Sequence, residues 1–465
     1  MSNGQWQGRK ILVLGLGDSG LSSIRWLARR GARLRAADTR EAPPSLGTVR
    51  AEQPGLDVVL GAFDEALLEG VDAVVASPGI ALREPILRAA AARGIEVVGD
   101  IEIFAREVAA VAPGARVLGV TGTNGKSTVA ALAGAMGSRA GMRTCVAGNI
   151  GLPALDALAS AEGRAAELFV IELSSYQLET TESLALDAAA MLNLTQDHMD
   201  RYDSMADYAR AKERIFRHAK ARVVNRDDAW SRAMGAGRDT FSFGLGVPRG
   251  ESEWGLDAAR EYLCRGAARL LPVEAMAMKG LHNAANALAA HALVSAIGAP
   301  SQALAEAARD FRGLRHRVEL VAEARGVRFF DDSKGTNVGA TVAALDGFTS
   351  PVVLIAGGDG KGQDFAPLVP AVKARARAVV LIGRDAPRLA AALAPAGVPM
   401  ERAATMAEAV ELAFKAAQPG DAVLLSPACA SLDMFRNYGH RGEVFAAAAR
   451  ALSSSALGEG RGEGR

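Results

Sequence analysis

Short apolar runs alternate along the chain with longer segments in which alanine, arginine and glutamate surround an apolar stripe. The run KILVL at residues 10–14 predicts a strand, and the glycine turn GLGDSG follows it directly. An amphipathic segment through Arg30 then predicts a helix that stops at Gly31, before a second strand that ends at Asp38. Strand, helix and strand in this order form a βαβ unit, so the pattern predicts the α/β class.

The same alternation continues and divides the chain into three parts. Further strands are expected at residues 71–77 and 96–98, and Pro113-Gly114 marks a break before the strand RVLGV. A new set of strands is expected at residues 327–330, 352–356, 379–382 and 422–425. We therefore predict a Rossmann-like domain over residues 1–108, a central P-loop ATPase-type domain with a parallel or mixed sheet over 109–313, and a second Rossmann-like domain over 314–452. Residues 453–465 lack periodicity and are rich in serine, glycine and charge, which predicts a disordered tail.

Composition narrows the classes of partner. The 465 residues include 53 Lys and Arg and 52 Asp and Glu, so the formal net charge of +1 disfavours bulk binding to nucleic acid or to an anionic membrane. Cys145, Cys264 and Cys429 stand far apart without CxxC spacing, which argues against a disulfide framework or a zinc ribbon. We find no secretory signal pattern and no apolar stretch suited to spanning a membrane, so we expect a protein of the cytoplasm.

The strongest chemical motif is GVTGTNGKSTVAAL, in which a strand leads into a glycine turn and then into a helix. Backbone N–H groups of such a turn can cradle phosphates, a lysine can neutralise the β- and γ-phosphate oxygens, and a hydroxyl can reach Mg²⁺. Val120 stands where the strict P-loop pattern has its first glycine, so the loop is a variant. The motif predicts binding of ATP or GTP at Gly122, Gly125, Lys126, Ser127 and Thr128.

A second glycine run, Gly15, Gly17 and Gly20, satisfies the dinucleotide fingerprint together with Asp38. Alone, this run would indicate a nicotinamide-dependent oxidoreductase. The glycine run does not by itself require a dinucleotide, because glycines at this spacing indicate only a tight turn and close helix packing. A helix N-terminus binds any pyrophosphate, including that of a nucleotide sugar. Binding of a dinucleotide, binding of a nucleotide sugar and plain packing all stay open at this point.

Metal-ligating side chains follow the later strands of the central region. Glu172 ends the strand of IELSSYQLE, and the segment NLTQDHMDRY precedes a helical stretch that carries Lys212. A nucleotide triphosphate brings Mg²⁺, which takes few protein oxygens besides phosphate and water, so Glu172 and Ser127 would suit it. Taken singly, His198 would more often be a core histidine, and Lys212 a solvated helix lysine. Further candidates for the metal shell in the same segment are Asn193, Thr195, Asp197 and Asp200.

Motifs spread over nearly the whole chain carry a family resemblance. They are GTNGKST, GNIG at residues 148–151, ELSSYQLE, NLTQDHMDRY with a downstream YxxAK, HNAANALAA at 282–290, LRHRVE, DDSKGTN, GGDGKGQDF and LSPACASLDMFRNYGHRG. In order and spacing, from Lys10 to about Arg450, they resemble the Mur ligase family of peptidoglycan synthesis. The segments GDIEIF, DTR and SPACASLDMF are similar to the member that adds D-glutamate, and the DNPR-type motif of the diamino-acid-adding members is absent.

The resemblance implies an ATP-dependent amide-bond ligase that joins D-glutamate to UDP-N-acetylmuramoyl-L-alanine in the cytoplasm. ATP phosphorylates the substrate carboxylate in this family, and the amine of the amino acid attacks the acyl phosphate to give a tetrahedral intermediate. The resemblance further implies ATP and two Mg²⁺ ions as cofactors, small-molecule substrates as the partners, no nucleic acid, no membrane span and a monomeric enzyme.

The resemblance also implies roles for single residues. ATP would be bound by Gly122, Thr123, Asn124, Gly125, Lys126, Ser127, Thr128, Asn283, Asn286, Arg317, Asp332 and Lys334. The UDP substrate would be bound by Gly17, Asp18, Ser19, Asp38, Thr39, Arg40, Ser77, Pro78, Gly79, Asn149 and His198. D-Glutamate would be bound by Thr336, Lys361, Ser431 and Tyr438. The metal ligands would be Ser127, Glu172, His198 and Lys212, and the catalytic residues Lys126, Glu172, His198, Lys212 and Lys334.

The lysine of YxxAK carries a carbamate in this family, and Lys212 occupies that position here. Two positions depart from the family pattern: Tyr438 stands where an aromatic residue without a hydroxyl is known, and Asp18-Ser19 replaces an apolar-hydroxyl pair. Two readings outside the family remain, a nicotinamide oxidoreductase and a GTP-dependent switch, although no NKxD motif for guanine is present. Within related enzymes, folylpolyglutamate synthase or another Mur ligase is the alternative.

Overall fold

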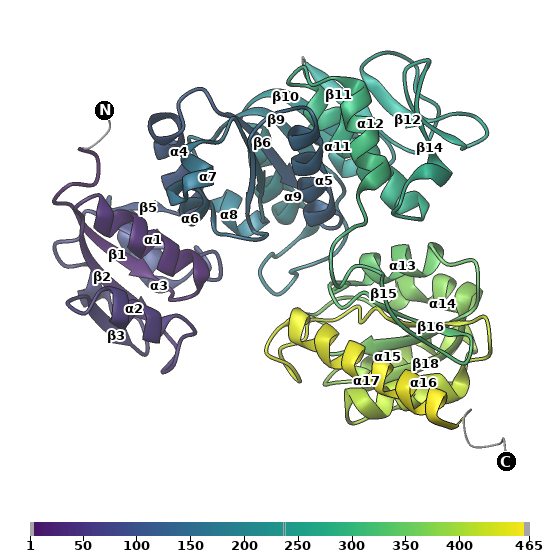
Figure 1. The fold of residues 1–465 in the computed structure, drawn as a ribbon. Coiled ribbons are helices and arrows are strands. Elements are labelled where there is room, and N and C mark those ends of the chain that lie inside the picture. Colours follow the sequence, from purple (N-terminus) through teal and green to yellow (C-terminus); the bar gives the residue numbers. More distant parts are fainter. Residues whose placement is uncertain (1–3, 236, 238, 460–465) are drawn as a thin grey trace. The chain divides into compact units, whose positions relative to one another are not determined.

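The computed structural model describes residues 4–235, 237 and 239–459 (Figure 1). Its strands build three separate sheets flanked by helices, so the predicted α/β class is confirmed. Contacts divide the described chain into two compact units. The first comprises the residues up to Leu194, Ala206–Met276 and Ala285–Phe311, and the second comprises Thr195–Met205, Ala277–Ala284 and the residues from Arg312 onward.

The first sheet contains five parallel strands. Their order is β3 (Asp57–Leu60), β2 (Arg33–Asp38), β1 (Lys10–Leu14), β4 (Ala73–Ala76) and β5 (Glu96–Val98). Alternate residues Leu12 and Leu14 of β1 are buried with side chains of η1 (Glu65–Leu68) and α3 (Pro85–Ala92). The remaining helices of this stretch are α1 (Asp18–Arg29), α2 (Leu46–Glu52) and α4 (Asp100–Val111). The strand order reverses between β1 and β4, which is where open parallel sheets bind ligands at their carboxyl edge.

The second sheet is mixed and has nine strands. Their order is β14 (Ala268–Pro272), β13 (Tyr262–Arg265), β12 (Glu253–Leu256), β11 (Thr240–Phe243), β10 (His218–Asn225), β9 (Ala185–Met191), β6 (Arg116–Thr121), β8 (Leu168–Glu172) and β7 (Thr144–Gly148). Neighbours from β7 to β12 are parallel, whereas β12, β13 and β14 are antiparallel. All of β8 is buried, because a central parallel strand is covered on both faces. The helices along this stretch are α5 (Lys126–Arg139), α6 (Ala154–Ala159), α7 (Ala161–Arg164), α8 (Ser175–Glu179), α9 (Met205–Glu213), α10 (Ala229–Met234), α11 (Leu281–Ser295) and α12 (Ser301–Asp310).

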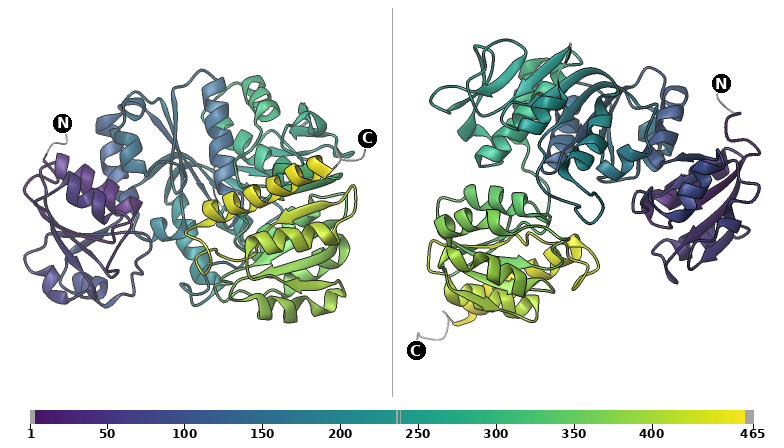
Figure 2. Two further views of the ribbon diagram at one scale, coloured as in Figure 1. Left: turned by 60° about the horizontal axis from the view of Figure 1, so that its bottom comes forward. Right: turned by 180° about the vertical axis from the view of Figure 1, so that it is seen from behind.

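The third sheet has its helices on both faces. Its order is β15 (Glu319–Ala324), β16 (Val327–Asp331), β20 (Ala422–Leu425), β17 (Val352–Gly357), β18 (Ala376–Ile382) and β19 (Met400–Arg402), and only β15 runs antiparallel. Val352 and Leu354 of β17 pack under α13 (Val338–Asp346), α14 (Val369–Arg375) and α15 (Ala386–Leu393). Val353 and Ile355 pack under α16 (Met406–Ala416) and α17 (Tyr438–Glu459), which Figure 2 shows along the opposite face. Successive residues of this apolar strand therefore point to opposite faces of the sheet and pack into two separate cores.

Two of the expected segment ends lie within helices. The boundary expected between residues 108 and 109 falls inside α4, which packs against both α1 and α6 and ends shortly before Pro113. The expected tail begins at residue 453, whereas α17 continues to Glu459 because its alanine and leucine residues favour helix more than its serines oppose it. Residues 460–465 lie outside the described residues.

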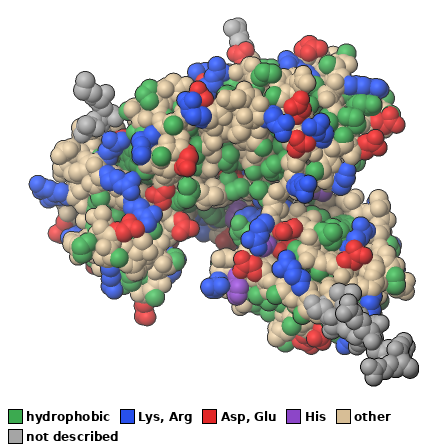
Figure 3. Space-filling view, in the orientation of Figure 1, with side chains coloured by type: hydrophobic (Ala, Val, Ile, Leu, Met, Phe, Trp, Pro, Cys, Tyr) green, Lys and Arg blue, Asp and Glu red, His purple; other side chains and the backbone are tan. Residues whose placement is uncertain are grey.

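The surface agrees with the balanced composition. Basic and acidic side chains are interspersed over the face drawn in Figure 3. Among the described residues, no helix is both long and apolar enough to cross a bilayer. Cys145, Cys264 and Cys429 are free thiols.

Candidate active site

The phosphate loop joins the end of β6 to the start of α5. Gly122 and Gly125 have φ angles of 150° and 84°, which L side chains rarely adopt. A Cβ atom on Gly125 would lie 2.6 Å from Oδ1 of Asn286, so this predicted ATP residue stands directly against the loop. Lys126 begins α5, and its Nζ donates to the carbonyl oxygens of Gly122 at 2.9 Å and Thr123 at 2.8 Å. The strand, turn and helix therefore form where the motif predicts them.

Asn193 fixes the shape of this loop. Its Oδ1 accepts from the N–H of Asn124 at 2.8 Å, and its Nδ2 donates to the Asn124 carbonyl at 3.1 Å. The Asn193 carbonyl also accepts from the N–H of Thr123 at 2.9 Å. The sequence offers Asn193 as a possible metal ligand, but in the structure its side chain supports the phosphate loop. No local pattern reveals this role, because the loop lies about 70 positions earlier in the sequence.

Lys212 lies beside the same loop and is only 1% exposed. Its Nζ donates to the Gly122 carbonyl at 2.8 Å and lies 3.4 Å from Oγ1 of Thr121. The Tyr208 ring centroid is 4.9 Å from the ammonium, and the Tyr208 hydroxyl lies 3.3 Å from Oγ1 of Thr123. The reading of Lys212 as an ordinary solvated helix lysine is therefore wrong, because burial and loop contacts hold it in place.

Glu172 ends β8 next to the loop strand, with Val120 of β6 and Gly148 of β7 as its register partners. The carboxylate is 1% exposed, and its Oε1 accepts from Nδ2 of Asn149 at 2.7 Å. Its Oε2 is buried and has no hydrogen-bond partner in the part of the chain that the structure describes. An anionic oxygen that is desolvated and unsatisfied is costly, so the residue fits a hard cation such as Mg²⁺. Ser127, in the first turn of α5, adds a buried hydroxyl.

His198 belongs to the second compact unit, whereas Glu172, Ser127 and Lys212 belong to the first. It lies in Thr195–Met205, which packs with the second unit, and has a φ of 59°. Its backbone N–H donates to Oδ1 of Asp197 at 2.9 Å. The place of His198 beside Glu172 stays a prediction. Among the described residues, His, Cys, Asp and Glu side chains spaced for a metal gather instead at His316, Glu319 and Asp331.

The first glycine turn lies at the carboxyl edge of β1. A Cβ on Gly20 would lie 1.9 Å from the Gly15 carbonyl oxygen, so this glycine serves close packing. Asp38 accepts from the Leu16 N–H at 2.7 Å and from Nε and Nη2 of Arg40 at 2.8 and 2.7 Å. Burial alone would raise the pKa of Asp38, but these bonds outweigh it and lower the pKa to about 2.

The engaged carboxylate of Asp38 weighs against the oxidoreductase reading, which needs it for a ribose hydroxyl. The other residues expected to bind the UDP substrate follow β1, β2 and β4 along the same edge. They are Gly17, Asp18, Ser19, Thr39, Arg40, Ser77, Pro78 and Gly79. Asn149 follows β7 in the second sheet.

In the second unit, the residues expected to bind D-glutamate follow three adjacent strands. Thr336 follows β16, Ser431 follows β20 and Lys361 follows β17. Backbone hydrogen bonds join these loops: Asp359 and Ala430 exchange N–H···O bonds of 3.0 and 2.7 Å. The structure therefore brings the three residues to one edge of one sheet. Tyr438 is 39% exposed, and Nζ of Lys334 lies 3.8 Å from its ring centroid.

The residues expected around the nucleotide are divided between the units. Asn286 belongs to the first unit, whereas Asn283, Arg317 and Asp332 belong to the second. Asp332 is 7% exposed, and its Oδ2 accepts from the Ser426 hydroxyl at 2.7 Å. Burial raises the pKa of Asp332 to about 7, against the opposing effects of that hydroxyl and of the Arg317 charge.

Arg441 was not singled out in the sequence. It is 1% exposed and donates to Oγ and the carbonyl oxygen of Ser333 at 2.9 and 2.7 Å and to the Cys429 carbonyl at 3.1 Å. Burial lowers the pKa of Arg441 to about 10. These bonds tie together the loops that carry Lys334 and Ser431. The motif RNYGHRG draws attention to Arg441 as a candidate. Its burial cannot be predicted from the motif, because that burial depends on loops that are distant in the sequence.

Comparison with known proteins agrees with this arrangement of loops. Family models match in chain order: a Mur ligase MurD-like N-terminal domain at residues 9–99, a Mur ligase middle domain at 120–294 and a Mur ligase glutamate ligase domain at 316–429. The chain belongs to the Mur ligase family. Among relatives of this Mur ligase, the UDP-N-acetylmuramoylalanine–D-glutamate ligase of Methylobacillus flagellatus is 55% identical over 95% of this chain and 96% of its own. The enzyme of the same name from Thiobacillus denitrificans is 53% identical over 97% and 98% of the two chains.

Solved structures share the fold of this Mur ligase at low sequence identity. The UDP-N-acetylmuramate-alanine ligase MurC of Thermotoga maritima is 18% identical, with a TM-score of 0.59 over 97% of this chain and 99% of that one. MurF of Acinetobacter baumannii is 16% identical, with a TM-score of 0.56 over 98% and 93%. These likenesses establish the architecture.

Proposed function

We propose that this Mur ligase joins D-glutamate to UDP-N-acetylmuramoyl-L-alanine with cleavage of ATP, in the synthesis of peptidoglycan precursors. The observation that carries the proposal is the identity of 53–55% over nearly the full length of relatives that bear this activity as their name. The geometry supports it, because a phosphate loop and a separate edge with Lys361 and Ser431 offer places for a triphosphate and for an anionic amino acid.

In the proposed reaction, the protein must position the reacting groups and neutralise the negative charge of the phosphates. A carboxylate is a poor electrophile until one of its oxygens becomes part of a phosphate leaving group. Transfer of a phosphoryl group needs alignment and cationic contacts more than covalent help. Lys126 and the backbone N–H groups of the first turn of α5 would hold the phosphates, and Lys334 would add positive charge.

The residues present fit Mg²⁺. Oε2 of Glu172 has no hydrogen-bond partner among the described residues and the hydroxyl of Ser127 is a hard oxygen, so both suit the ion. We assign His198 and a carbamylated Lys212 to the same task for two ions. When bound, Mg²⁺ supplies charge neutralisation for the phosphate oxygens. Asn149 holds Glu172 in place through its 2.7 Å hydrogen bond.

The remaining assignments concern the other substrates and the setting. We assign the first-sheet loops to the UDP moiety, and Thr336, Lys361, Ser431 and Tyr438 to D-glutamate. The proposal includes three domains over residues 1–108, 109–313 and 314–452, a monomeric enzyme and a location in the cytoplasm, where ATP and UDP-sugars are available. Sedimentation of the purified chain and cell fractionation test the last two points.

The decisive experiment is a phosphate-release assay with ATP, Mg²⁺ and UDP-N-acetylmuramoyl-L-alanine against a panel of amino acids. D-Glutamate should support turnover, and L-glutamate, L-alanine and meso-diaminopimelate should not. Turnover with another amino acid of the panel instead of D-glutamate would identify a different ligase of the family. NADH binding measured by fluorescence provides the matching test of the oxidoreductase reading and should give no signal.

A further inference from the structure

Lys361 forms a buried ion pair with Asp197. The distance from Nζ to Oδ1 is 2.5 Å, and the two side chains are 14% and 8% exposed. Both residues belong to the second unit, although 164 positions separate them in the sequence. The family resemblance implies that Lys361 binds D-glutamate, and the sequence offers Asp197 only as a possible metal ligand, so the function described above does not use this carboxylate.

The position of Asp197 is set from several sides. Nδ2 of Asn337 donates to its Oδ2 at 3.2 Å, and the N–H of His198 donates to its Oδ1 at 2.9 Å. Asn337 is itself held, because it caps α13 through a 2.9 Å bond from the Ala340 N–H to its Oδ1. Such a carboxylate is pre-organised, so it contributes recognition without first losing side-chain freedom.

The backbone also orients Lys361. Its φ of 50° is a left-handed conformation that a lysine adopts only when its surroundings impose it. Oδ1 of Asp359 accepts from the Lys361 N–H at 2.9 Å, and Oδ2 of Asp385 accepts from the Gly360 N–H at 2.7 Å. These two aspartates shape the turn that presents the ammonium to Asp197.

The charges of the Lys361–Asp197 pair limit which ligand this site can bind. A dicarboxylate that drew Lys361 away would cost the mostly buried Asp197 carboxylate its closest cation, the ammonium at 2.5 Å, while the His198 ring stays farther off, with Nε2 at 3.6 Å from Oδ2. A dicarboxylic amino acid carries its own ammonium. If Lys361 turns to a ligand carboxylate and the ligand ammonium takes its place at Asp197, both Lys361 and Asp197 keep a close partner of opposite charge.

We propose that Asp197 recognises the ammonium group of the amino-acid substrate and thereby selects amino acids over plain dicarboxylates. This inference rests on the proposed function, because it deepens the D-glutamate site. Asp197 is here a specificity-determining residue, and Lys361 exchanges one carboxylate partner for another when the substrate binds.

The test compares D-glutamate with glutarate, which has the same five-carbon dicarboxylate chain without an amino group. Each is titrated by calorimetry into the full chain saturated with UDP-N-acetylmuramoyl-L-alanine and a non-hydrolysable ATP analogue. The wild-type chain should bind D-glutamate more tightly than glutarate by at least roughly tenfold, the size of a charge-assisted bond. Asp197→Asn should weaken D-glutamate by a similar factor and leave glutarate unchanged or tighter.

The outcomes separate the possible roles. Equal loss of both ligands in Asp197→Asn would overturn the proposal, since Asp197 would then be only a counter-ion that orients Lys361. Equal affinity of the wild-type chain for the two ligands would overturn the proposal without any variant, even if Asp197→Asn did not fold.

Asp421→Asn is the matched control. Asp421 is also buried and paired, with Nε of Arg377 at 2.5 Å, but it lies directly before β20. It should shift neither affinity. A wild-type chain that binds neither ligand and does not ligate D-glutamate would instead refute the proposed function.

Discussion

At the scale of single residues, the most specific prediction concerns Lys212. A lysine with an ordinary pKa of about 10.4 is a cation at neutral pH, which is unfavourable near Mg²⁺. If the ammonium loses a proton and the amine adds CO₂ with release of a second proton, the resulting carbamate shares one negative charge between two oxygens, the ligands that Mg²⁺ prefers. We expect Lys212→Ala to lose most of its turnover and to recover part of it when acetate or formate is added to the phosphate-release assay.

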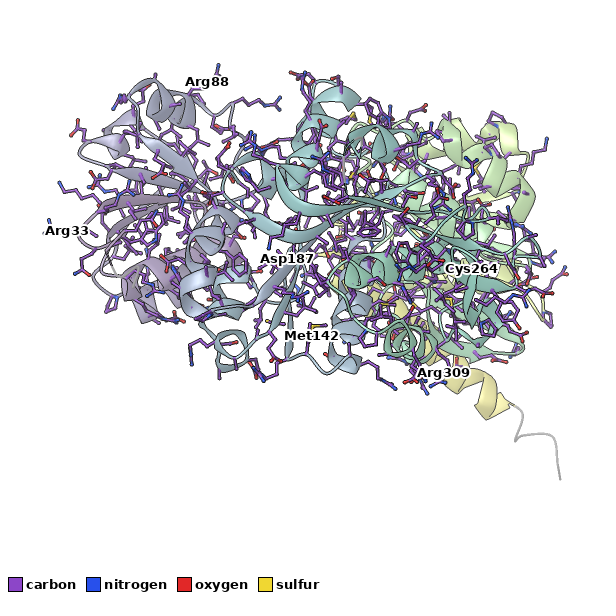
Figure 4. All side chains as sticks on the ribbon, turned by 90° about the horizontal axis from the view of Figure 1, so that it is seen from above. Arg33, Arg88, Met142, Asp187, Cys264 and Arg309 are labelled. Atoms are coloured by element: carbon purple, nitrogen blue, oxygen red, sulfur yellow. The ribbon has the colours of Figure 1, made fainter. Side chains whose placement is uncertain are left out.

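A matched lysine controls this experiment. Lys220 is 75% exposed at its side chain and pairs with Asp187 at 2.8 Å, which stands on β9 and is labelled in Figure 4. Lys220→Ala should be nearly silent in the same assay, because an exposed ion pair contributes little. A fully active Lys212→Ala enzyme would refute the carbamate.

Two glycines of the first turn differ sharply in what they tolerate. Gly20→Ala places a Cβ 1.9 Å from the Gly15 carbonyl, an overlap with backbone that only a shift of the turn can relieve. We expect a loss of about 1–3 kcal/mol in the free energy of unfolding, measured with urea. A Cβ on Gly17 meets nothing within 4 Å, so Gly17→Ala should lose less, about 1 kcal/mol at most, because alanine is a poorer N-cap of α1 than glycine. Equal losses in the two variants would contradict the packing argument.

At the scale of elements, His291 connects α11 with β12 and predicts a pH-dependent stability. The ring is 3% exposed; its Nδ1 accepts from Nε1 of Trp254 at 2.9 Å, and its Nε2 lies 3.1 Å from the hydroxyl of Ser301. Burial lowers the pKa of His291 from 6.5 to about 4. Between these two pH values the unfolded chain binds a proton that the folded chain does not, so stability is complete above pH 6.5 and is lost as the pH falls toward 4.

The contribution of His291 reaches about 3 kcal/mol at the acid end of this window. Urea unfolding at pH 7.5 and pH 5 measures it. In His291→Gln, which has no titrating ring, the difference between the two pH values should shrink by most of that amount. His218 is exposed at the start of β10, and His218→Gln should leave the difference as in wild type. An unchanged difference in His291→Gln would show that other groups carry the acid sensitivity.

At the scale of the whole molecule, the phosphate loop and the D-glutamate residues belong to different compact units. Cleavage of ATP in the proposed reaction needs an acceptor carboxylate, and release of phosphate needs the amine that attacks the acyl phosphate. We expect phosphate release to fall to background, about a hundredth of the full rate or less, when either UDP-N-acetylmuramoyl-L-alanine or D-glutamate is omitted. Brisk hydrolysis of ATP alone would count against this coupling.

The sequence by itself determined the features that are encoded in contiguous stretches of chain. The strands at residues 10–14 and 422–425 were predicted within these bounds, and the glycine turns before α1 and α5 lie where their spacing placed them. The α/β class and the membership in the Mur ligase family follow from the same local patterns in their order. Strand propensity, turn geometry and the start of a helix depend on neighbours within a few residues, so one sequence suffices to find them.

Only the tertiary structure decided which charges are buried and what pairs with them. Lys212 and Gly122 stand 90 positions apart and Asp197 and Lys361 stand 164 apart, so no periodicity relates them. Taken singly, Lys212 suggested a solvated helix lysine, and only the family resemblance implied a metal ligand there; Asp197 was one of several possible metal ligands. The physical reason is that the chemical state of an ionisable group depends on desolvation and on partners that distant strands bring within about 3–4 Å, and those distances exist only once the sheets have formed.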